Sequence, residues 1–194
     1  MTGKRTVLIT GATGKQGGAI VRALLAGDFR LRALTRNPDG ETAKSLGYKG
    51  VEVVRGDLND ADSIRAALDG VWGAYGVQNT WEAGVEGEEE QGKRFARLAR
   101  EAGVERFVYS SVGSAERKTG VPHFDNKFRV EETIRALDFP SYTILRPVFF
   151  MENLISPWFL QEGKLVAALS PETRLQMVAV KDIGDCFALL AGLL

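Results

Sequence analysis

Three glycines near the start of the chain have the spacing of a phosphate-binding loop. The loop comprises Gly11, Ala12, Thr13, Gly14, Lys15, Gln16 and Gly17. Glycine permits a sharp turn and a close approach of the backbone to a pyrophosphate, and the helix that follows offers unpaired N–H groups. A tight strand-to-helix turn that binds nothing would use glycine in the same way. The position of the loop directly after the first apolar run favours dinucleotide binding. No Gly-Lys-Ser/Thr follows at the spacing of a Walker loop.

A second candidate residue, Arg36, follows the next apolar stretch in the sequence Leu-Thr-Arg-Asn. In dinucleotide-binding folds an acid about 20 residues after the glycines binds the ribose 2′-hydroxyl, whereas an arginine accommodates a 2′-phosphate. We find no acid at this strand end, so Arg36 predicts NADP(H) rather than NAD(H), and Lys15 would add positive charge. The alternative is a solvated surface arginine.

Asp57 and Leu58 follow the third apolar stretch in the sequence Gly-Asp-Leu. Asp57 could accept a hydrogen bond from an adenine amino group, and Leu58 could pack on the ring. The alternative for Asp57 is a helix or turn cap. The sequence leaves both interpretations open.

The elements that must position these residues alternate along the chain. Strands are predicted at 7–9, 30–35, 51–57, 71–77, 106–111 and 142–147, with helical patterns between them, including 88–103 and 126–138. This alternation predicts an α/β fold with a doubly wound parallel sheet in the order 3-2-1-4-5-6. Residues 1–150 form the predicted nucleotide-binding domain. Residues 151–194 form a short or truncated C-terminal lobe, with strands at 164–169 and 176–180, a helix at 182–194 and an apolar end.

Composition excludes several classes of protein. The 194 residues include 25 Lys plus Arg and 25 Asp plus Glu, so no net charge attracts nucleic acid or an anionic membrane. No apolar run is long enough for a membrane-spanning helix, and no cluster has metal-ligand spacing. The single cysteine, Cys186, predicts a reducing, cytoplasmic location and a small core residue. The acidic run 86–90 predicts a solvated helix start, and Trp72, Trp81 and Trp158 predict packing or lid residues.

Seven stretches spread over nearly the whole chain resemble one family. They are TGATGKQGG, TRNP, GDLND, FVYSSVGS, HFDNK, TILRPVFFMENL and VAVKDIGD. Together they resemble the atypical short-chain dehydrogenase superfamily and, within it, the NmrA-like group. Members of this group often act as NADP-sensing regulators that bind partner proteins, whereas others reduce quinones or carbonyls. Members usually extend further than this chain, so part of the lobe for substrate or partner would be missing.

The resemblance implies further cofactor contacts. One group lies at the fourth strand end, beside the adenosine ribose or the nicotinamide, and a second lies after the sixth strand, against the nicotinamide. These groups are Gln78, Asn79 and Thr80, and Pro147, Val148, Phe149 and Phe150. Their alternatives are a polar loop and ordinary packing.

The resemblance also implies a catalytic centre, but with one departure. Active short-chain dehydrogenases carry Tyr-x-x-x-Lys on one helix face, with a serine near the fifth strand end. Here Lys127 is present, Ser110 or Ser111 is available, and His123 occupies the tyrosine position. Imidazole can transfer protons near neutral pH. A single histidine can equally be structural, so His123, Lys127 and Ser111 are candidate catalytic residues, and Lys127 is also a candidate ribose ligand.

Three functions follow from these residues. The first is an NADP(H)-binding, redox-sensing regulator with little or no catalysis and a protein partner. The second is an NADPH-dependent quinone or carbonyl oxidoreductase. The third is a trimmed or designed scaffold that keeps the motifs without the function.

Overall fold

Six parallel strands form the central sheet of the computed structural model, which describes residues 3–170 and 172–190. The strands are β1 (Arg5–Ile9), β2 (Phe29–Thr35), β3 (Glu52–Arg55), β4 (Gly73–Gly76), β5 (Arg106–Ser110) and β6 (Ser141–Leu145). Their order is β3-β2-β1-β4-β5-β6, which confirms the predicted topology. β-branched and other apolar residues dominate these strands because helices cover both faces of a parallel sheet.

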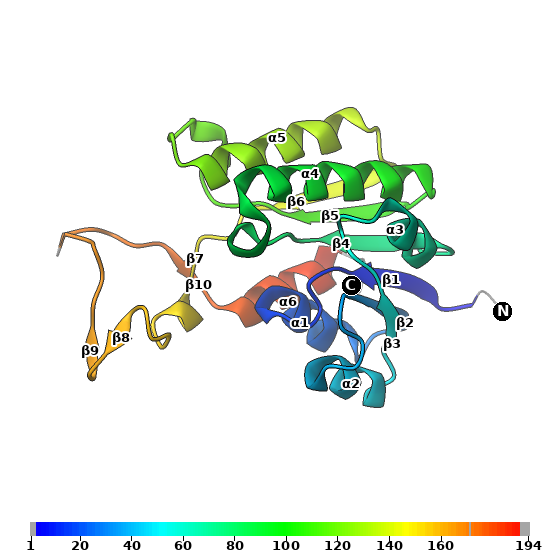
Figure 1. Cartoon of the computed structure of the whole chain (residues 1–194), viewed down its shortest axis with the longest axis horizontal. Helices are drawn as coiled ribbons and strands as arrows, with labels where there is room; N and C mark the ends of the chain where they lie inside the picture. Colours follow the sequence, from blue (N-terminus) through cyan, green and yellow to red (C-terminus); the bar gives the residue numbers. More distant parts are fainter. Residues whose placement is uncertain (1–2, 171, 191–194) are drawn as a thin grey trace.

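Helices cover the two faces of the sheet (Figure 1). They are α1 (Lys15–Leu24), α2 (Glu41–Tyr48), α3 (Ala61–Leu68), α4 (Thr80–Glu101), α5 (Pro122–Ala136) and α6 (Val180–Leu190). α1, α2 and α6 share one apolar core with the sheet, and α3, α4 and α5 share the other. Neighbouring residues of a strand point to opposite faces, so Phe107 and Tyr109 enter the α4–α5 core while Val108 enters the α1–α6 core.

The strand registers bring the predicted site residues to one edge of the sheet. Ile9 lies opposite both Ala33 and Tyr75, so the glycine loop, Arg36 and the residues after β4 emerge side by side. Ser110 lies opposite Leu145 at the same edge. The carboxyl ends of parallel strands are where open α/β sheets bind ligands.

Helix α4 begins earlier than the predicted residue 88. Asn79 caps it by accepting a hydrogen bond from the Trp81 backbone N–H at 3.2 Å, so Thr80 is helical. Gly84 has φ 72° and ψ 171°, which separates a first turn from the main body of the helix. Periodicity failed here because the first turn is fixed by a cap and a positive-φ glycine rather than by an apolar stripe.

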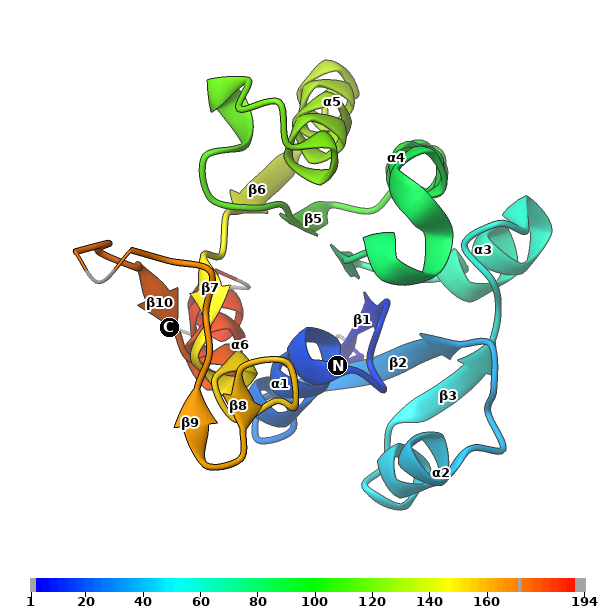
Figure 2. The same cartoon turned by 60° about the vertical axis from the view of Figure 1, so that its left-hand side comes forward.

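The C-terminal segment contains short strands that lie beside the sheet (Figure 2). β7 (Phe149–Phe150) pairs with β10 (Met177–Val178), and β8 (Leu160–Gln161) pairs with β9 (Lys164–Leu165). Two 3₁₀ turns occupy Ala115–Arg117 and Met151–Asn153. The strands predicted at 164–169 and 176–180 are therefore only two residues long.

Helix α6 belongs to the core of the nucleotide-binding fold although it lies in the predicted lobe. A side chain at Gly184 would place its Cβ 2.6 Å from the Ala19 carbonyl oxygen, so α6 packs closely on α1. Ile183 and Phe187 are buried, whereas Cys186 is exposed. The prediction that Cys186 is a core residue is wrong, because it falls on the outer face of the helix. The predicted apolar end at 191–194 lies outside the described residues.

No helix in the described ranges has the length and apolar character needed to cross a membrane.

Candidate dinucleotide-binding site

The glycine loop gives each of its three glycines a separate task. Gly11 has φ +59°, a conformation that favours glycine. A Cβ on Gly17 would lie 2.3 Å from the Gly11 carbonyl oxygen, so the loop packs on the helix only if Gly17 has no side chain. Gly14 is the N-cap of α1 and makes no side-chain capping bond, and the first turn of α1 contains no acidic residue. The α1 N-terminus is therefore suited to an anion such as a pyrophosphate.

The loop is held against the end of β5 by Gln16. Its Oε1 accepts hydrogen bonds from Ser110 Oγ at 2.7 Å and from the Tyr75 hydroxyl at 3.2 Å. Burial raises the pKa of Tyr75, although the hydrogen bond with Ser110 lowers it, so this phenol remains a donor at neutral pH. Lys15 Nζ donates to Asn153 Oδ1 at 3.2 Å, which connects the loop to the C-terminal segment. Ala12 is buried, and Thr13 is exposed.

Arg36 lies at the predicted edge but has an acidic partner. Its guanidinium pairs with the Glu82 carboxylate, and both side chains are more than half exposed. No acid stands at the end of β2 in the sequence, but Glu82 reaches Arg36 from the first turn of α4. This contact joins residues 46 positions apart, so the local sequence around Arg36 could not reveal it.

Asp57 serves as a turn cap in this structure. Its Oδ1 accepts a hydrogen bond from the Asn59 backbone N–H at 2.8 Å. Leu58 is partly buried against the core formed with α3 and α4. The geometry matches the capping alternative for Asp57 and leaves the adenine contact a prediction.

The three polar residues after β4 have separate environments. Gln78 is 7% exposed, and neither polar atom of its amide has a hydrogen-bond partner. Asn79 caps α4, and Thr80 Oγ1 donates to Glu88. The contacts with ribose or nicotinamide that the resemblance implies for these residues remain predictions.

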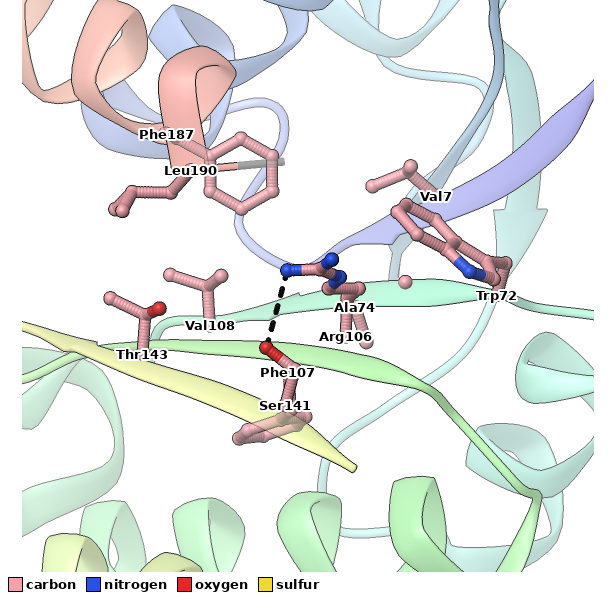
Figure 3. A pocket seen from close by; sticks show the side chains of 11 residues that line it. Val7, Trp72, Ala74, Arg106, Phe107, Val108, Ser141, Thr143, Phe187 and Leu190 are labelled. Atoms are coloured by element: carbon pink, nitrogen blue, oxygen red, sulfur yellow. Dashed lines mark hydrogen bonds between the residues drawn. The ribbon is translucent and has the colours of Figure 1, made fainter. Parts of the chain in front are cut away.

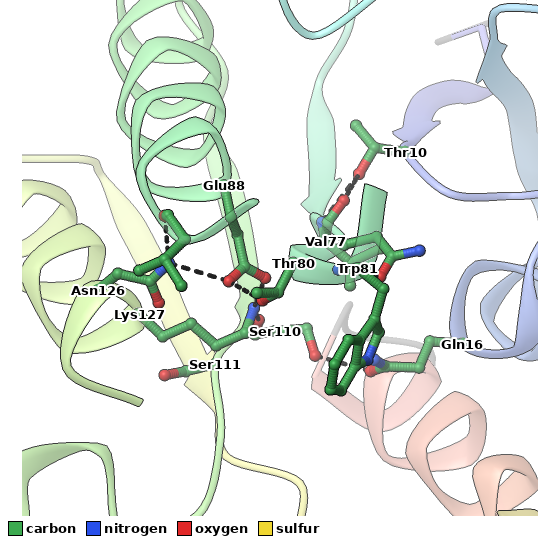
Figure 4. A network of polar contacts seen from close by, with 12 residues as sticks. Thr10, Gln16, Val77, Thr80, Trp81, Glu88, Ser110, Ser111, Asn126 and Lys127 are labelled. Carbon is green, nitrogen blue, oxygen red and sulfur yellow. Dashed lines mark hydrogen bonds and ion pairs between the residues drawn. The ribbon is translucent and has the colours of Figure 1, made fainter. Parts of the chain in front are cut away.

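Lys127 is committed to a buried ion pair (Figure 4). Its Nζ lies 2.9 Å from Glu88 Oε1 and 3.4 Å from the Ser110 carbonyl oxygen. Glu88 is 1% exposed and also accepts hydrogen bonds from Thr80 and from Asn126 Nδ2, the latter at 3.0 Å. The carboxylate is thus surrounded by donors, as a buried charge requires.

Ser110, the last residue of β5, and Ser111, which follows it, face opposite sides of the sheet. Ser110 points toward the glycine loop, whereas Ser111 Oγ donates to Glu131 Oε1 at 2.5 Å. Glu131 is fully buried and also pairs with Arg135 and Arg146, at 2.8 and 2.6 Å. Burial raises the pKa of the Glu131 carboxyl, but hydrogen bonds from Arg146, Ser111 and Arg135 outweigh it, so the pKa is lowered. Of the two serines, Ser110 rather than the predicted Ser111 adjoins the loop.

His123 lies in the first turn of helix α5, one turn before Lys127, as its position in the sequence predicts. Its ring centroid lies 6.3 Å from that of Trp81 and 4.7 Å from that of Phe124. No hydrogen bond orients the imidazole within residues 3–170 and 172–190. A general acid or base is normally oriented by such a partner. His123 is partly buried and its ring contacts are with Trp81 and Phe124, so it packs like an aromatic residue.

The segment after β6 connects the sheet to the short C-terminal strands. The Pro147 carbonyl accepts a hydrogen bond from the Gly113 N–H at 2.8 Å, and a Cβ on Gly113 would meet Val148 at 2.9 Å. Phe149 packs edge-on against Phe159 at 5.1 Å, and Phe150 contacts the α1–α6 core. The nicotinamide contact of these residues remains a prediction.

A small pocket lies toward the amino ends of the strands, and Figure 3 shows the side chains that line it. Trp72, Arg106, Ser141 and Phe187 are among the residues that line it. Arg106 donates to Ser141 Oγ at 3.3 Å. The pocket shares no lining residue with the glycine loop.

The sequence patterns did not reveal the carboxylates that hold the site residues. The acidic run 86–90 is not uniformly solvated, because Glu88 is buried. One signal was available: Glu88 shares a helix face with Gly92, Phe95 and Ala99, all of them buried. Glu82 offered a weaker signal, since it stands three residues after Asn79, the spacing of a capping box.

The sheet order, the glycine loop and the free N-terminus of α1 define a Rossmann-type nucleotide-binding fold. Residues 3–191 match the model of the NmrA-like family. The chain belongs to this family.

Individual relatives agree with that assignment. The chain is 32% identical over 212 residues to the NmrA-like family domain-containing oxidoreductase malD of Malbranchea aurantiaca, covering 95% of this chain and 63% of malD. It therefore spans less than two thirds of that relative. The NADP(H) complex of Citrobacter sp. triphenylmethane reductase matches with a TM-score of 0.81 and 25% identity, over 96% of this chain and 65% of the reductase. NmrA, a negative transcriptional regulator, matches with a TM-score of 0.80 and 25% identity, over 96% and 61%.

Proposed function

We propose that the chain binds NADP(H) and acts as a redox-sensing regulator with little or no catalysis. The glycine loop would hold the pyrophosphate at the α1 N-terminus, and Arg36 would contact the 2′-phosphate. The observation that carries the proposal is the pairing of Lys127 with buried Glu88 at 2.9 Å. Bound nicotinamide supplies a hydride donor or acceptor, whose oxidation state a sensor would distinguish.

The Glu88 carboxylate weakens the case for proton transfer at this centre. A lysine cation lowers the pKa of a neighbouring acid by favouring its charged form. Glu88 pairs with the Lys127 cation at 2.9 Å, so the two charges cancel. The pair therefore presents no net positive charge that would favour loss of a proton by a neighbouring acid. Ser111 is likewise engaged by Glu131. These contacts favour a binding site over a centre that protonates the oxygen of a carbonyl substrate as it is reduced.

A second candidate is an NADPH-dependent oxidoreductase acting on a quinone or a carbonyl compound. Its support is the similarity to malD, which is named an oxidoreductase, and to triphenylmethane reductase. Reduction of a quinone depends less on a positioned proton donor than reduction of a carbonyl does. A histidine in place of the tyrosine at position 123 would therefore impair quinone reduction less. The cytoplasmic location inferred from the single cysteine suits both candidates.

Binding and turnover measurements separate the candidates. Calorimetric titration with NADPH, NADP and NADH tests the site, and absorbance at the nicotinamide band then follows NADPH oxidation over quinones and carbonyls. A sensor binds NADPH and NADP with different affinities and reduces neither class of substrate. Steady NADPH oxidation that depends on an added quinone or carbonyl would establish the oxidoreductase. Failure to bind any dinucleotide would leave the scaffold interpretation.

A further inference from the structure

We propose that Glu82 is a specificity-determining residue that competes with the cofactor 2′-phosphate for Arg36. This inference rests on the proposed function, because it assumes that NADP(H) occupies the edge of the sheet where Arg36 lies. The Glu82 carboxylate is an anion already paired with Arg36. NADP(H) must displace it in order to bind, whereas NAD(H), which has no 2′-phosphate, need not. The preference of the site for the 2′-phosphate is therefore smaller than Arg36 alone would give.

Glu82 is held in place by the start of α4. It stands three residues after the helix cap Asn79, whose Nδ2 donates to Glu82 Oε1 at 3.2 Å, while Asn79 Oδ1 accepts from Trp81 N–H. Its second oxygen is then directed at the Arg36 guanidinium. A carboxylate in the first turn is also favoured by the helix dipole. The acid is thus positioned by its own helix, whether or not Arg36 is available.

Exposure makes this contact displaceable. The Arg36 side chain is 64% exposed and that of Glu82 is 54% exposed, so both groups are accessible to a ligand. Exposed ion pairs contribute little stability, because water and salt screen them and side-chain entropy opposes them. Arginine binds phosphate through two parallel hydrogen bonds, and a phosphate dianion carries more charge than a carboxylate. A 2′-phosphate should therefore replace Glu82 on Arg36.

The Glu82 side chain can leave Arg36 without a change in the helix. It is 54% exposed, so rotation about its own side-chain bonds moves the carboxylate toward solvent. The backbone of the first turn then stays in place, and with it the hydrogen bond from Thr80 to the buried Glu88.

Glu82→Gln tests the proposal because it removes the charge and keeps the shape. Glutamine preserves the reach of the capping position. Glu86→Gln is the matched control, since Glu86 is an exposed acid four residues further along the same helix. Dissociation constants for NADPH and NADH are measured by calorimetry for the unmodified chain and both variants, with thermal melting as a check on folding. Arg36→Gln and the Arg36→Gln/Glu82→Gln double variant complete the set.

We expect Glu82→Gln to tighten NADPH binding by about two- to fivefold, the factor that corresponds to an exposed ion pair. NADH binding should change little, Glu86→Gln should leave both affinities near those of the unmodified chain, and Glu82→Gln should have no effect on top of Arg36→Gln. Weaker NADPH binding by Glu82→Gln would mean that Glu82 positions Arg36 for the phosphate, and would overturn the proposal. Equal gains for NADPH and NADH, equal gains from Glu82→Gln and Glu86→Gln, or unchanged NADPH affinity would also overturn it. If no dinucleotide binds to any of these chains, the proposed function fails and this inference falls with it.

Discussion

Removing the charge of Glu88 should strongly destabilise the fold. Glu88→Gln leaves the Lys127 ammonium, whose side chain is 11% exposed, without the carboxylate 2.9 Å away. Loss of one partner of a buried ion pair costs about 3–5 kcal/mol. For a domain of this size each 1 kcal/mol lowers Tm by about 2–4 °C, so the expected decrease is about 6–20 °C.

Chemical and thermal denaturation measure this effect, with Glu86→Gln as the control. Because Glu86 is exposed, its substitution should change the unfolding free energy by no more than about 0.5 kcal/mol. Lys127→Met in the Glu88→Gln background should restore part of the loss, because it removes the uncompensated charge. The expected coupling between the two sites is about 1–3 kcal/mol. A loss below about 1 kcal/mol for Glu88→Gln, or strictly additive effects of the two changes, would refute the buried-pair reasoning.

Three further predictions address the loop, the histidine and the buried acid of α5. Gly14→Val should abolish NADPH binding, because a branched side chain would occupy the space of the pyrophosphate. The fold should stay intact, since Gly14 has an ordinary φ of −97° and its Cβ would meet only the Gly11 carbonyl, at 3.3 Å. Retained affinity in calorimetry would contradict the loop assignment. His123→Ala should leave NADPH affinity nearly unchanged; carbonyl-dependent NADPH oxidation that disappears in this variant would instead identify a general acid. The lowered pKa of Glu131 means that its contribution to stability is present above its unfolded-state pKa and is lost as the pH falls through the folded-state pKa. Glu131→Gln should therefore flatten the acid limb of unfolding free energy against pH, and an unchanged slope would count against this linkage.

The sequence by itself determined the fold and the location of the loop. Local patterns carry both, since alternating apolar strands and helices predict the parallel sheet, and the spacing of Gly11, Gly14 and Gly17 marks the turn into α1. Such signals are readable because each depends on residues close together in the chain. Family membership also followed from motifs spread over the chain, and the match over residues 3–191 confirms it.

Only the tertiary structure decided which partners the site residues have. The pairing of Arg36 with Glu82 and of Lys127 with Glu88 joins separate elements, so neither pair leaves a local pattern. The sequence likewise did not determine which side of the sheet Ser111 faces, because this depends on where β5 ends and on the contact of Ser111 with Glu131. Burial is the physical reason: a glutamate in an acidic run is solvated by default, and Glu88 became a buried counter-ion because packing of α4 on α5 enclosed it with Lys127.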